Sequence, residues 1–505
     1  MVLYRGLLKS CNYRCSYCPF SKHRHSGEEL LKDREKWFQF VEKVEQEALP
    51  GDHCLMVVPY GEALIHPWYW DGLGRLSRLP SFGAVGAQTN FSFPLEEALE
   101  RFFRAGGKSF KLRLWATFHP EMVTVEAFAE KCRKAMEAGI LLCAGAVGAP
   151  ENMALLKSLR ASLPDELYLW VNKLDGLKRP YTQAEIQGFM DIDPFFYREL
   201  RLNPANPKLC AGRVFAQGDG KLGLCSISPS IKEKWDGDEP GAGIFSERIS
   251  LAGGICSRKR CSCYLAYGGR KDLMNQVLFG PYPIFRIPRR PKAVFLDIDG
   301  TLIPKGSRQI PQDVEEDLAA LAKNGGTYLL FATSLPLAEA KKRCEKVWHL
   351  FCGGVFAGGA HLRLGRFSEK GREMVHPFEG NRLIPAINAL REKLEGRPFR
   401  LLVYREKGAV YKISLVRPAQ RPWEEKEAGK IAGILKREWD GEGIRVFTEG
   451  SCMQIVSAAA AKAKGVRQIC RWLGIAPREA VAAGDGMEDQ EMLSLCQGIN
   501  LSEKS

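Results

Sequence analysis

The chain has 505 residues, enough for two or three domains, and its 45% hydrophobic and 26% charged residues are typical of a globular protein. No apolar run approaches the roughly 20 residues that a membrane-spanning helix needs, and no signal-peptide pattern opens the chain. The net charge of +14 permits anionic partners, but the basic residues are dispersed rather than striped. We therefore expect a cytoplasmic protein that binds anionic small molecules, with no membrane partner and no nucleic acid.

The first 200 residues alternate apolar, strand-like runs with helical patterns. Six strands are predicted, at 2–8, 54–58, 84–87, 110–115, 141–147 and 167–171. Helical patterns lie between them, for example at 28–48, 125–138 and 154–159. Alternation of this kind predicts an α/β fold in which helices wrap a parallel sheet, with functional groups at the carboxyl ends of the strands.

Three cysteines follow the first predicted strand with C-x3-C-x2-C spacing: Cys11, Cys15 and Cys18. Three thiolates on one short loop can hold three irons of a [4Fe–4S] cube and leave the fourth iron open to a ligand. Zinc is the alternative, because cysteine knots of similar size hold it, and His23 or His25 could supply a fourth ligand.

The cysteine spacing resembles that of the radical S-adenosylmethionine (SAM) superfamily, whose partial (β/α)6 TIM barrel matches the six predicted strands. The resemblance implies that the open iron chelates SAM and that an electron donor such as flavodoxin or ferredoxin supplies the electron that cleaves it. The 5′-deoxyadenosyl radical so formed would abstract hydrogen from a substrate. Tyr17 fills the position that is usually aromatic in the family, where the backbone meets the adenine.

A second resemblance to the same superfamily follows the second predicted strand, at residues 59–63 (Pro-Tyr-Gly-Glu-Ala). This run is similar to the family's Gly-Gly-Glu-Pro motif, which binds the methionine ammonium of SAM. The resemblance implies that Glu62 provides the carboxylate and that Gly61 permits a close backbone approach.

Polar residues also end the later strands of the predicted sheet. Residues 88–90 (Gln-Thr-Asn) end the third strand, and Thr117 and His119 end the fourth. We expect Thr117 to contact SAM, and Asn172, at the end of the sixth strand, to do so as well. His119 could contact the substrate or could be a structural histidine.

Five more cysteines crowd the centre of the chain: Cys210, Cys225, Cys256, Cys261 and Cys263. The run from Cys210 through Gly220 to Cys225 resembles the opening of the SPASM/Twitch module, which implies that four of the five hold one auxiliary [4Fe–4S] cluster. A structural zinc is the alternative. We assign residues 1–202 to the partial barrel, 203–275 to a small cysteine-rich module, and the proline-rich segment 276–290 to a solvated linker.

A different α/β domain is predicted from residue 291 to 505, with strands at 293–296, 328–332 and 480–483. Asp297 and Asp299 follow the first of these strands in a D-x-D-G-T-L run. This run resembles the first motif of haloacid-dehalogenase (HAD) superfamily phosphatases, which have a Rossmann-like core. Asp297 would attack phosphorus, Asp299 would serve as general acid and base, and Mg²⁺ would offset the repulsion between carboxylates and phosphate.

The remaining HAD motifs follow in order. Thr333 would hydrogen-bond the phosphoryl oxygens, Lys464 would supply a positive charge, and Asp485 and Asp489 would complete the Mg²⁺ site with Asp297 and Asp299.

About 130 residues separate Thr333 from Lys464, far more than an ordinary loop. The insert resembles the C2-type cap of Cof-like HAD phosphatases, an α/β lid that selects the substrate, at about 357–452. The usual Thr-Gly-Arg of the second motif reads Thr-Ser-Leu at 333–335, which removes an arginine and predicts altered substrate choice.

Together these features predict a bifunctional enzyme. The radical SAM domain would oxidise or rearrange a phosphorylated small molecule, such as a sugar phosphate or nucleotide. The HAD domain would hydrolyse a phosphate monoester of the substrate or product, since fusion raises the local concentration of one site's product at the other. The alternatives are radical modification of a peptide or tRNA beside an independent phosphatase, and a HAD domain that serves as a scaffold.

Overall fold

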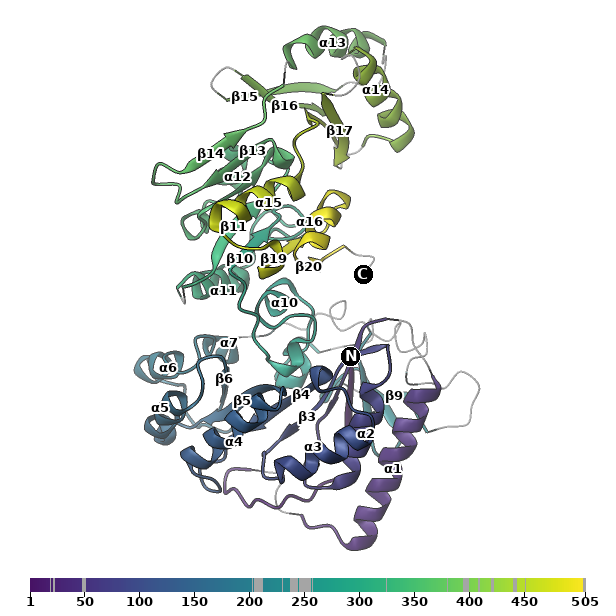
Figure 1. Cartoon of the computed structure of the whole chain (residues 1–505), viewed down its shortest axis with the longest axis vertical. Coiled ribbons are helices and arrows are strands. Elements are labelled where there is room, and N and C mark those ends of the chain that lie inside the picture. Colours follow the sequence, from purple (N-terminus) through teal and green to yellow (C-terminus); the bar gives the residue numbers. More distant parts are fainter. Residues whose placement is uncertain are drawn as a thin grey trace. The chain divides into compact units, whose positions relative to one another are not determined.

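The computed structural model of the chain contains two compact units, Met1–Arg289 and Arg290–Ser505, each built on its own sheet (Figure 1). The structure describes every residue except 19, 21–22, 48–50, 202, 204–211, 229, 237–243, 245–255, 257, 324, 379, 394–398, 407–408, 419–421, 439–442, 450 and 503–505. In the described part of the chain, no helix has both the length and the hydropathy needed to cross a membrane.

The N-terminal unit is built on a nine-stranded sheet with the order β6-β5-β4-β3-β2-β1-β7-β8-β9. Strands β1 to β7 run parallel to one another, whereas β8 pairs antiparallel with β7, and β9 pairs antiparallel with β8. The strands are β1 Val2–Gly6, β2 His53–Val57, β3 Phe82–Thr89, β4 Leu112–Thr117, β5 Leu141–Gly148, β6 Leu169–Lys173, β7 Val214–Gln217, β8 Lys221–Gly223 and β9 Ser230–Lys234. The six predicted strands and the α/β class are therefore confirmed.

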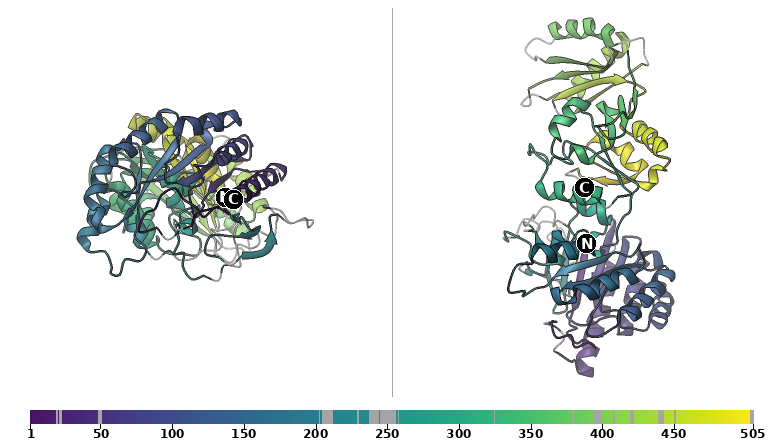
Figure 2. Two further views of the ribbon diagram at one scale, coloured as in Figure 1. Left: turned by 90° about the horizontal axis from the view of Figure 1, so that it is seen from below. Right: turned by 90° about the vertical axis from the view of Figure 1, so that its left-hand side faces the viewer.

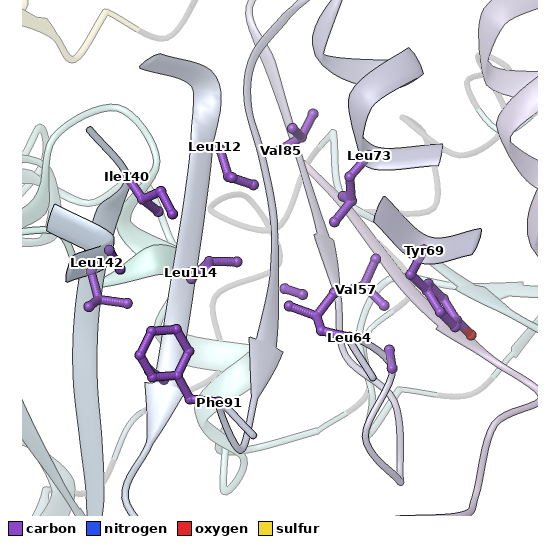
Figure 3. Close-up of a cluster of buried hydrophobic side chains, with 14 of the residues drawn as sticks. Val57, Leu64, Tyr69, Leu73, Val85, Phe91, Leu112, Leu114, Ile140 and Leu142 are labelled. Carbon is purple, nitrogen blue, oxygen red and sulfur yellow. The ribbon is translucent and has the colours of Figure 1, made fainter. Parts of the chain in front are cut away.

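Helices connect the parallel strands and pack on one face of this sheet (Figure 1). They are α1 Gly27–Gln46, α2 Pro67–Ser77, α3 Leu95–Arg104, α4 Val125–Glu137, α5 Met153–Ser162, α6 Gln183–Met190 and α7 Tyr197–Leu200. Alternate strand residues such as Val57, Val85 and Leu114 form a core with Tyr69 and Leu73 of α2 (Figure 3). Burying each such side chain contributes about 1.5–3 kcal/mol, which fixes the sheet beneath the helices.

The predicted linker, 276–290, is instead part of the N-terminal unit. It contains the end of α10 (Leu273–Phe279) and a 3-10 helix, Pro283–Phe285, in which Ile284 and Phe285 are fully buried. Arg286 is 2% exposed, and its guanidinium lies 3.5 Å from the carboxylate of Glu199. The linker prediction was wrong because it weighed the prolines above the apolar residues between them.

The boundary predicted at residue 203 also differs from the structure. Strands β7 to β9, from the segment predicted as a separate cysteine-rich module, continue the sheet of the barrel segment, with β7 paired to β1. The module is therefore not a separate layer, because its few apolar strand residues are buried in the core of the larger sheet.

The C-terminal unit is built on a seven-stranded sheet with the order β14-β13-β12-β11-β10-β19-β20. Its strands are β10 Ala293–Leu296, β11 Tyr328–Ala332, β12 Gly353–Phe356, β13 His361–Leu364, β14 Arg372–Val375, β19 Ala480–Gly484 and β20 Gln497–Asn500. Its helices are α11 Gln312–Lys323, α12 Leu337–Arg343, α15 Lys462–Leu473 and α16 Gln490–Leu495. Five strands that are adjacent in the sheet are parallel: β12, β11, β10, β19 and β20. Strand β13 pairs antiparallel with β12, and β14 pairs antiparallel with β13.

A second, four-stranded antiparallel sheet lies between β14 and α15 in the sequence, and we call it the cap sheet. Its order is β15-β16-β18-β17, with bounds β15 Arg400–Glu406, β16 Ala409–Val416, β17 Ile444–Glu449 and β18 Cys452–Ser457. Helices α13 (Leu383–Lys393) and α14 (Glu425–Glu438) cover its face away from the seven-stranded sheet (Figure 2). The predicted cap began too early, at 357, because β13 and β14 extend the core sheet, and it ended before β18 was complete.

Candidate functional sites

A cavity of about 610 Å³ lies in the N-terminal unit where the parallel strands end. Its wall includes residues from the loop after β1 and from the ends of β2 to β6. Many of the residues that the sequence singled out in this region line it: Cys11, Cys15, Tyr17, Cys18, Gly61, Glu62, residues 88–90, Thr117, His119 and Asn172. The structure thus brings the cysteine loop and the later strand ends together at one site.

The start of the cysteine loop is fixed by a buried carboxylate. Gly6 ends β1 with φ +68°, a conformation that favours glycine, and the backbone N–H of Leu7 donates to Asp33 Oδ1 at 3.1 Å. The other oxygen of Asp33 accepts from the Tyr69 hydroxyl at 2.8 Å. Helices α1 and α2 therefore hold the point at which the loop leaves the sheet.

The loop after β2 packs directly against the cysteine loop. A Cβ atom at Gly61 would lie 1.7 Å from the carbonyl oxygen of Ser10, so no side chain fits there. The N–H of Glu62 donates to the same carbonyl oxygen at 3.0 Å. Any side chain at position 61 would push Gly61 and Glu62 away from Ser10, the residue before Cys11. The close contact between the two loops therefore requires glycine at this position.

Glu62 is 2% exposed and is surrounded by donors. Its carboxylate accepts from the N–H of Leu64 at 2.9 Å, the Thr89 hydroxyl at 2.8 Å and the N–H of Asn90 at 2.5 Å. Burial raises the pKa of Glu62 to about 7 against the opposing effect of these hydrogen bonds. A cationic ligand group in the cavity would favour the ionised carboxylate, as the predicted role requires.

This pKa predicts how Glu62→Gln changes the stability of the ligand-free protein. The folded state holds a proton on Glu62 between the ordinary carboxyl pKa and about 7, where the unfolded state has lost it. The free energy of unfolding should therefore fall as the pH rises from about 5 to 8. In Glu62→Gln this fall should be smaller in urea denaturation, and equal slopes in both proteins would contradict the assignment.

The sulfur of Cys11 lies among nitrogen donors. The N–H of Tyr13 lies 3.4 Å and the amide of Asn90 lies 3.5 Å from Cys11 Sγ. Burial raises the pKa of the Cys11 thiol to about 11. Donors of this kind stabilise a sulfur that carries negative charge, as a metal-bound thiolate does.

His119 lies against the cysteine loop. Its Nδ1 lies 3.4 Å from Cys15 Sγ and 2.7 Å from the Tyr17 hydroxyl, and burial lowers the pKa of His119 to about 4. These contacts favour the structural role that the sequence left open. Tyr17 therefore contacts His119 through its hydroxyl, a partner that the sequence did not indicate.

The two histidines that could have completed a zinc site do not join the cysteines. His25 Nε2 accepts from the N–H of Lys9 at 2.8 Å, so a neutral ring carries its proton on Nδ1 and has no lone pair left for a metal. Within the described ranges, the three-ligand group that contains His23 and His25 is completed by Glu29, without a cysteine.

The central cysteines are only partly brought to the site. Cys263 lines the cavity, and its sulfur lies 3.2 Å from the hydroxyl of Ser226, the residue after Cys225. Cys261 is buried and Cys256 is half-buried, whereas Cys210 lies outside the described residues. Among the cysteines that the structure does describe, no three sulfurs lie within 4.8 Å of one another.

The second candidate site lies at the carboxyl edge of the seven-stranded sheet. Asp297 follows β10, Thr333 follows β11 and Asp485 follows β19, and these three strands are neighbours in the sheet. Asp297 and Thr333 are buried. Hydrogen bonds to Val355 and Gly358 hold the backbone of Thr333 in place. Because the three strands are neighbours, the side chains that the sequence selected meet at one edge of the sheet.

Lys462, rather than Lys464, provides the buried positive charge. The Lys462 ammonium donates to Asp297 Oδ1 at 3.0 Å and to Asp489 Oδ1 at 2.8 Å. The Lys464 ammonium is exposed and donates to the carbonyl of Ala458 at 3.2 Å. The sequence predicted Lys464, but the structure places Lys462, two residues earlier on α15, beside the two aspartates instead.

Three carboxylates form a compact oxygen set here. Ligand atoms of Asp297, Asp485 and Asp489 all lie within 4.8 Å of one another, and carboxylate oxygens are the donors that Mg²⁺ prefers. This set fits the ion. A Cβ atom at Gly300 would lie 2.3 Å from the Asp485 carboxylate, so the glycine with φ +84° makes room for it.

Asp299 is not part of this oxygen set, which corrects its predicted place among the Mg²⁺ ligands. Its carboxylate is hydrogen-bonded to the guanidinium of Arg343, at the end of α12. Leu335 stands where the second HAD motif usually has an arginine. Arg343, eight residues further along the chain, brings a guanidinium to the site instead.

Four residues of this site were not found from the sequence: Arg343, described above, Lys462, Lys412 and Arg445. Lys462 could have been found from its place two residues before Lys464. Lys412 of β16 donates to the carbonyl of Ser334, and Arg445 of β17 lies 3.3 Å from Glu488. No local signal identified these two cap-sheet residues, because their proximity arises from folding of the cap sheet over the core.

The comparisons with known proteins concern the C-terminal unit. Residues 401–499, which include Lys462, Asp485 and Asp489, match the family of haloacid dehalogenase-like hydrolases. The C-terminal unit therefore contains a haloacid dehalogenase-like hydrolase domain. A putative phosphatase of Buchnera aphidicola is 41% identical over 49 residues, which are 10% of this chain and 18% of that protein.

Two of the solved structures that resemble the chain are described as haloacid dehalogenase-like or HAD-superfamily proteins. A haloacid dehalogenase-like hydrolase from B. subtilis is 15% identical, with a TM-score of 0.33, over 41% of this chain and 88% of that one. A HAD-superfamily phosphatase from Bacteroides thetaiotaomicron is 16% identical, with a TM-score of 0.33, over 41% and 82% of the two chains.

Proposed function

We propose that the C-terminal unit hydrolyses phosphate monoesters. The observation that carries this proposal is the Lys462 ammonium, which joins the buried carboxylates of Asp297 and Asp489 beside Asp485. A nucleophilic carboxylate, a fixed cation and an oxygen set for Mg²⁺ are the groups that phosphoryl transfer requires.

Each residue then has a defined role. Asp297 attacks phosphorus and forms an aspartyl-phosphate, while Lys462 and Thr333 stabilise the charge on the transferring oxygens. Asp299 donates a proton to the leaving oxygen and later accepts one from water, once Arg343 has released it. Mg²⁺ bound by Asp297, Asp485 and Asp489 would supply charge neutralisation for the phosphate.

Asp297→Asn is expected to abolish hydrolysis of p-nitrophenyl phosphate in the presence of Mg²⁺. The amide is not a nucleophile, so the loss should reach at least about 1000-fold. Asp313→Asn, at an exposed position of α11, is the matched control and should retain activity. Equal turnover by the wild type and Asp297→Asn would end the hydrolase proposal.

We also propose that the N-terminal unit is a partial (β/α)6 barrel that binds a [4Fe–4S] cluster and SAM. The cavity that joins Cys11, Cys15, Cys18 and Glu62 supports this proposal. The three cysteines lie on the wall of one cavity, where a cluster with an open iron would meet its ligand.

The residues of the chain position and shield the cofactors. Cys11, Cys15 and Cys18 would hold three irons, and Glu62 would accept hydrogen bonds from the ammonium of SAM. Thr117 and Asn172 line the same cavity and would contact SAM or the substrate. When bound and reduced, the cluster and SAM would supply radical chemistry in this cavity.

A second, auxiliary cluster or a structural zinc remains our proposal for the central cysteines. Cys263 on the cavity wall supports a place for it beside the substrate. Cys225, Cys256 and Cys261 would provide the other ligands from the described segment, and Cys210 is a further candidate from the sequence alone.

The two activities in one chain support consecutive steps on one phosphorylated small molecule, such as a sugar phosphate or nucleotide. A flavodoxin or ferredoxin would supply electrons to a cytoplasmic enzyme of this kind. Anaerobic incubation with SAM, dithionite and candidate phosphates tests the coupling. 5′-Deoxyadenosine and free phosphate should rise together with the right substrate, and 5′-deoxyadenosine formed on a peptide or tRNA without phosphate release would favour the alternative.

A further inference from the structure

The sheet of the N-terminal unit presents a row of side chains to its cavity. The core on the helix side of this sheet contains four residues that pair in register across β1 to β4: Tyr4, Val57, Ala87 and Leu114. Because successive residues of a strand alternate between its two faces, the residue after each of them lies on the opposite face. These residues all line the cavity, and they are Arg5, Val58, Gln88 and Trp115. Arg5 is the charged member of the row.

Aromatic rings and hydrogen bonds fix the guanidinium of Arg5. It lies 4.2 Å from the centre of the Tyr60 ring and 4.7 Å from the centre of the Phe215 ring. Its Nε donates to the carbonyl oxygen of Val58 at 3.2 Å, and its Nη1 donates to the Tyr60 hydroxyl at 2.8 Å. A guanidinium has five N–H donors, so these two bonds hold its orientation and leave donors for a ligand.

No carboxylate pairs with Arg5 in the part of the chain that the structure describes. Burial lowers the pKa of Arg5, and the groups that oppose this effect are Tyr60 and Cys263, neither of which carries a carboxylate. Of the two acids on the cavity wall, Glu62 accepts from three other donors, and Asp175 is exposed after β6, five strands from β1 in the sheet order. A half-buried cation without a counter-charge favours an anionic ligand.

The place of Arg5 connects this anion to the proposed chemistry. Tyr60, its hydrogen-bond partner, immediately precedes Gly61 and Glu62, which we propose to bind SAM. Cys263, whose electrostatic effect reaches Arg5, is a proposed ligand of the auxiliary cluster and lines the same cavity. An anion at Arg5 therefore lies beside both proposed cofactors, where a substrate of the radical step has to lie.

The other end of the row suits the uncharged part of a ligand. The ring centre of Trp115 lies 4.5 Å from that of Trp170 and 4.6 Å from that of Tyr264, and all three residues line the cavity. Gln88 stands between Arg5 and Trp115 in the row and brings an amide that can donate or accept. The cavity of about 610 Å³ thus has a cationic end at β1 and an aromatic end at β4 and β6.

We propose that Arg5 binds an anionic group, a phosphate or a carboxylate, of the substrate on which the N-terminal unit acts. The planar fork of a guanidinium matches both groups, to which it makes two parallel hydrogen bonds. This inference rests on the proposed radical function and names the group by which the substrate is held. A phosphate at Arg5 would also set the order of the two activities, because the radical step would then precede removal of the phosphate.

Equilibrium dialysis of the anaerobically reconstituted full chain against radiolabelled inorganic phosphate or acetate tests the inference and separates the two groups. SAM is present, so that it occupies the open iron, and Mg²⁺ is left out, so that the hydrolase site lacks the ion that offsets its carboxylates. At least one anion should bind the wild type, and Arg5→Met should weaken this binding by about tenfold or more. The anion that shows this loss identifies the ligand group.

Two further variants separate anion binding from a structural role. Arg5→Lys keeps the charge without the fork, so it should retain part of the binding, and it decides the question if Arg5→Met does not fold. Arg34→Met is the matched control, because Arg34 also lies over an aromatic ring, 5.9 Å from the centre of Phe38, but is exposed on α1. Its anion binding should equal that of the wild type. Iron content and SAM affinity should be the same in all four proteins.

The outcomes distinguish this inference from the function on which it rests. Wild-type protein that binds neither anion would overturn it, as would equally tight binding by Arg5→Met. A variant Arg5→Met that loses affinity for SAM alone would also overturn it, because Arg5 would then hold the carboxylate of SAM. Protein without iron that still binds an anion through Arg5 would contradict the cluster and leave the anion site in place.

Discussion

Lys462→Met is expected to lower hydrolysis of p-nitrophenyl phosphate by the C-terminal unit by about 100- to 1000-fold, mainly in kcat. The ammonium is 2% exposed and lies within 3.0 Å of both Asp297 and Asp489. Its removal takes away the fixed positive charge at the transferring phosphate. It also leaves two buried carboxylates without their cation, so the melting temperature should fall at neutral pH.

Lys464→Met is the matched control, two residues further along α15. Its ammonium is exposed and bonded to a backbone carbonyl, so we expect nearly unchanged kcat and melting temperature. Lys462→Arg, with far-UV circular dichroism, separates loss of charge from loss of folding. If Lys464→Met were the inactive protein and Lys462→Met the active one, the assignment from the structure would be wrong.

The second large effect concerns the N-terminal cysteines. After anaerobic reconstitution, replacing Cys11, Cys15 and Cys18 by alanine should remove about four iron and four sulfide per chain relative to the wild type. Formation of 5′-deoxyadenosine from SAM under dithionite should stop. Hydrolysis of p-nitrophenyl phosphate should persist, because the two candidate sites belong to different compact units.

Cys132→Ala serves as the control for this experiment. Cys132 is fully buried in the core of the N-terminal unit, away from the residues that line the cavity, and should not change the iron content. A colourless wild-type protein that contains zinc and leaves SAM intact would contradict the cluster. Iron that remains at wild-type level in the triple variant would place the cluster on the central cysteines instead.

Much of the fold could be read from local patterns. The strands around Leu55, Leu114 and Val294 were found because short apolar runs alternate with helical periodicity. This periodicity depends only on which side chains face the core. The candidate residues at strand ends followed from the rule that functional groups of parallel sheets gather at one edge. The cavity around Cys11 and Glu62 and the carboxylates around Asp297 agree with that rule.

The misassigned segments show where local patterns fail. The prolines of 276–290 suggested a spacer, but Phe285 and Arg286 are buried against residues far away in the sequence, such as Glu199. Strands β13 and β14 were placed in the cap because they lie in the long insert between Thr333 and Lys464. Their hydrogen bonds to the core sheet, starting with the pairing of β12 and β13, decide otherwise.

By itself the sequence determined the two α/β units, the cysteine loop after the first strand and the acidic motifs of the hydrolase, because spacing and periodicity express these features directly. Only the tertiary structure decided that Lys462 reaches Asp297 and that Lys412 reaches Ser334. Residues two apart on a helix point in nearly opposite directions, so α15 can turn only one of its two lysines inward. Contacts across 78 residues, such as that of Lys412, form only when the cap sheet folds over the core.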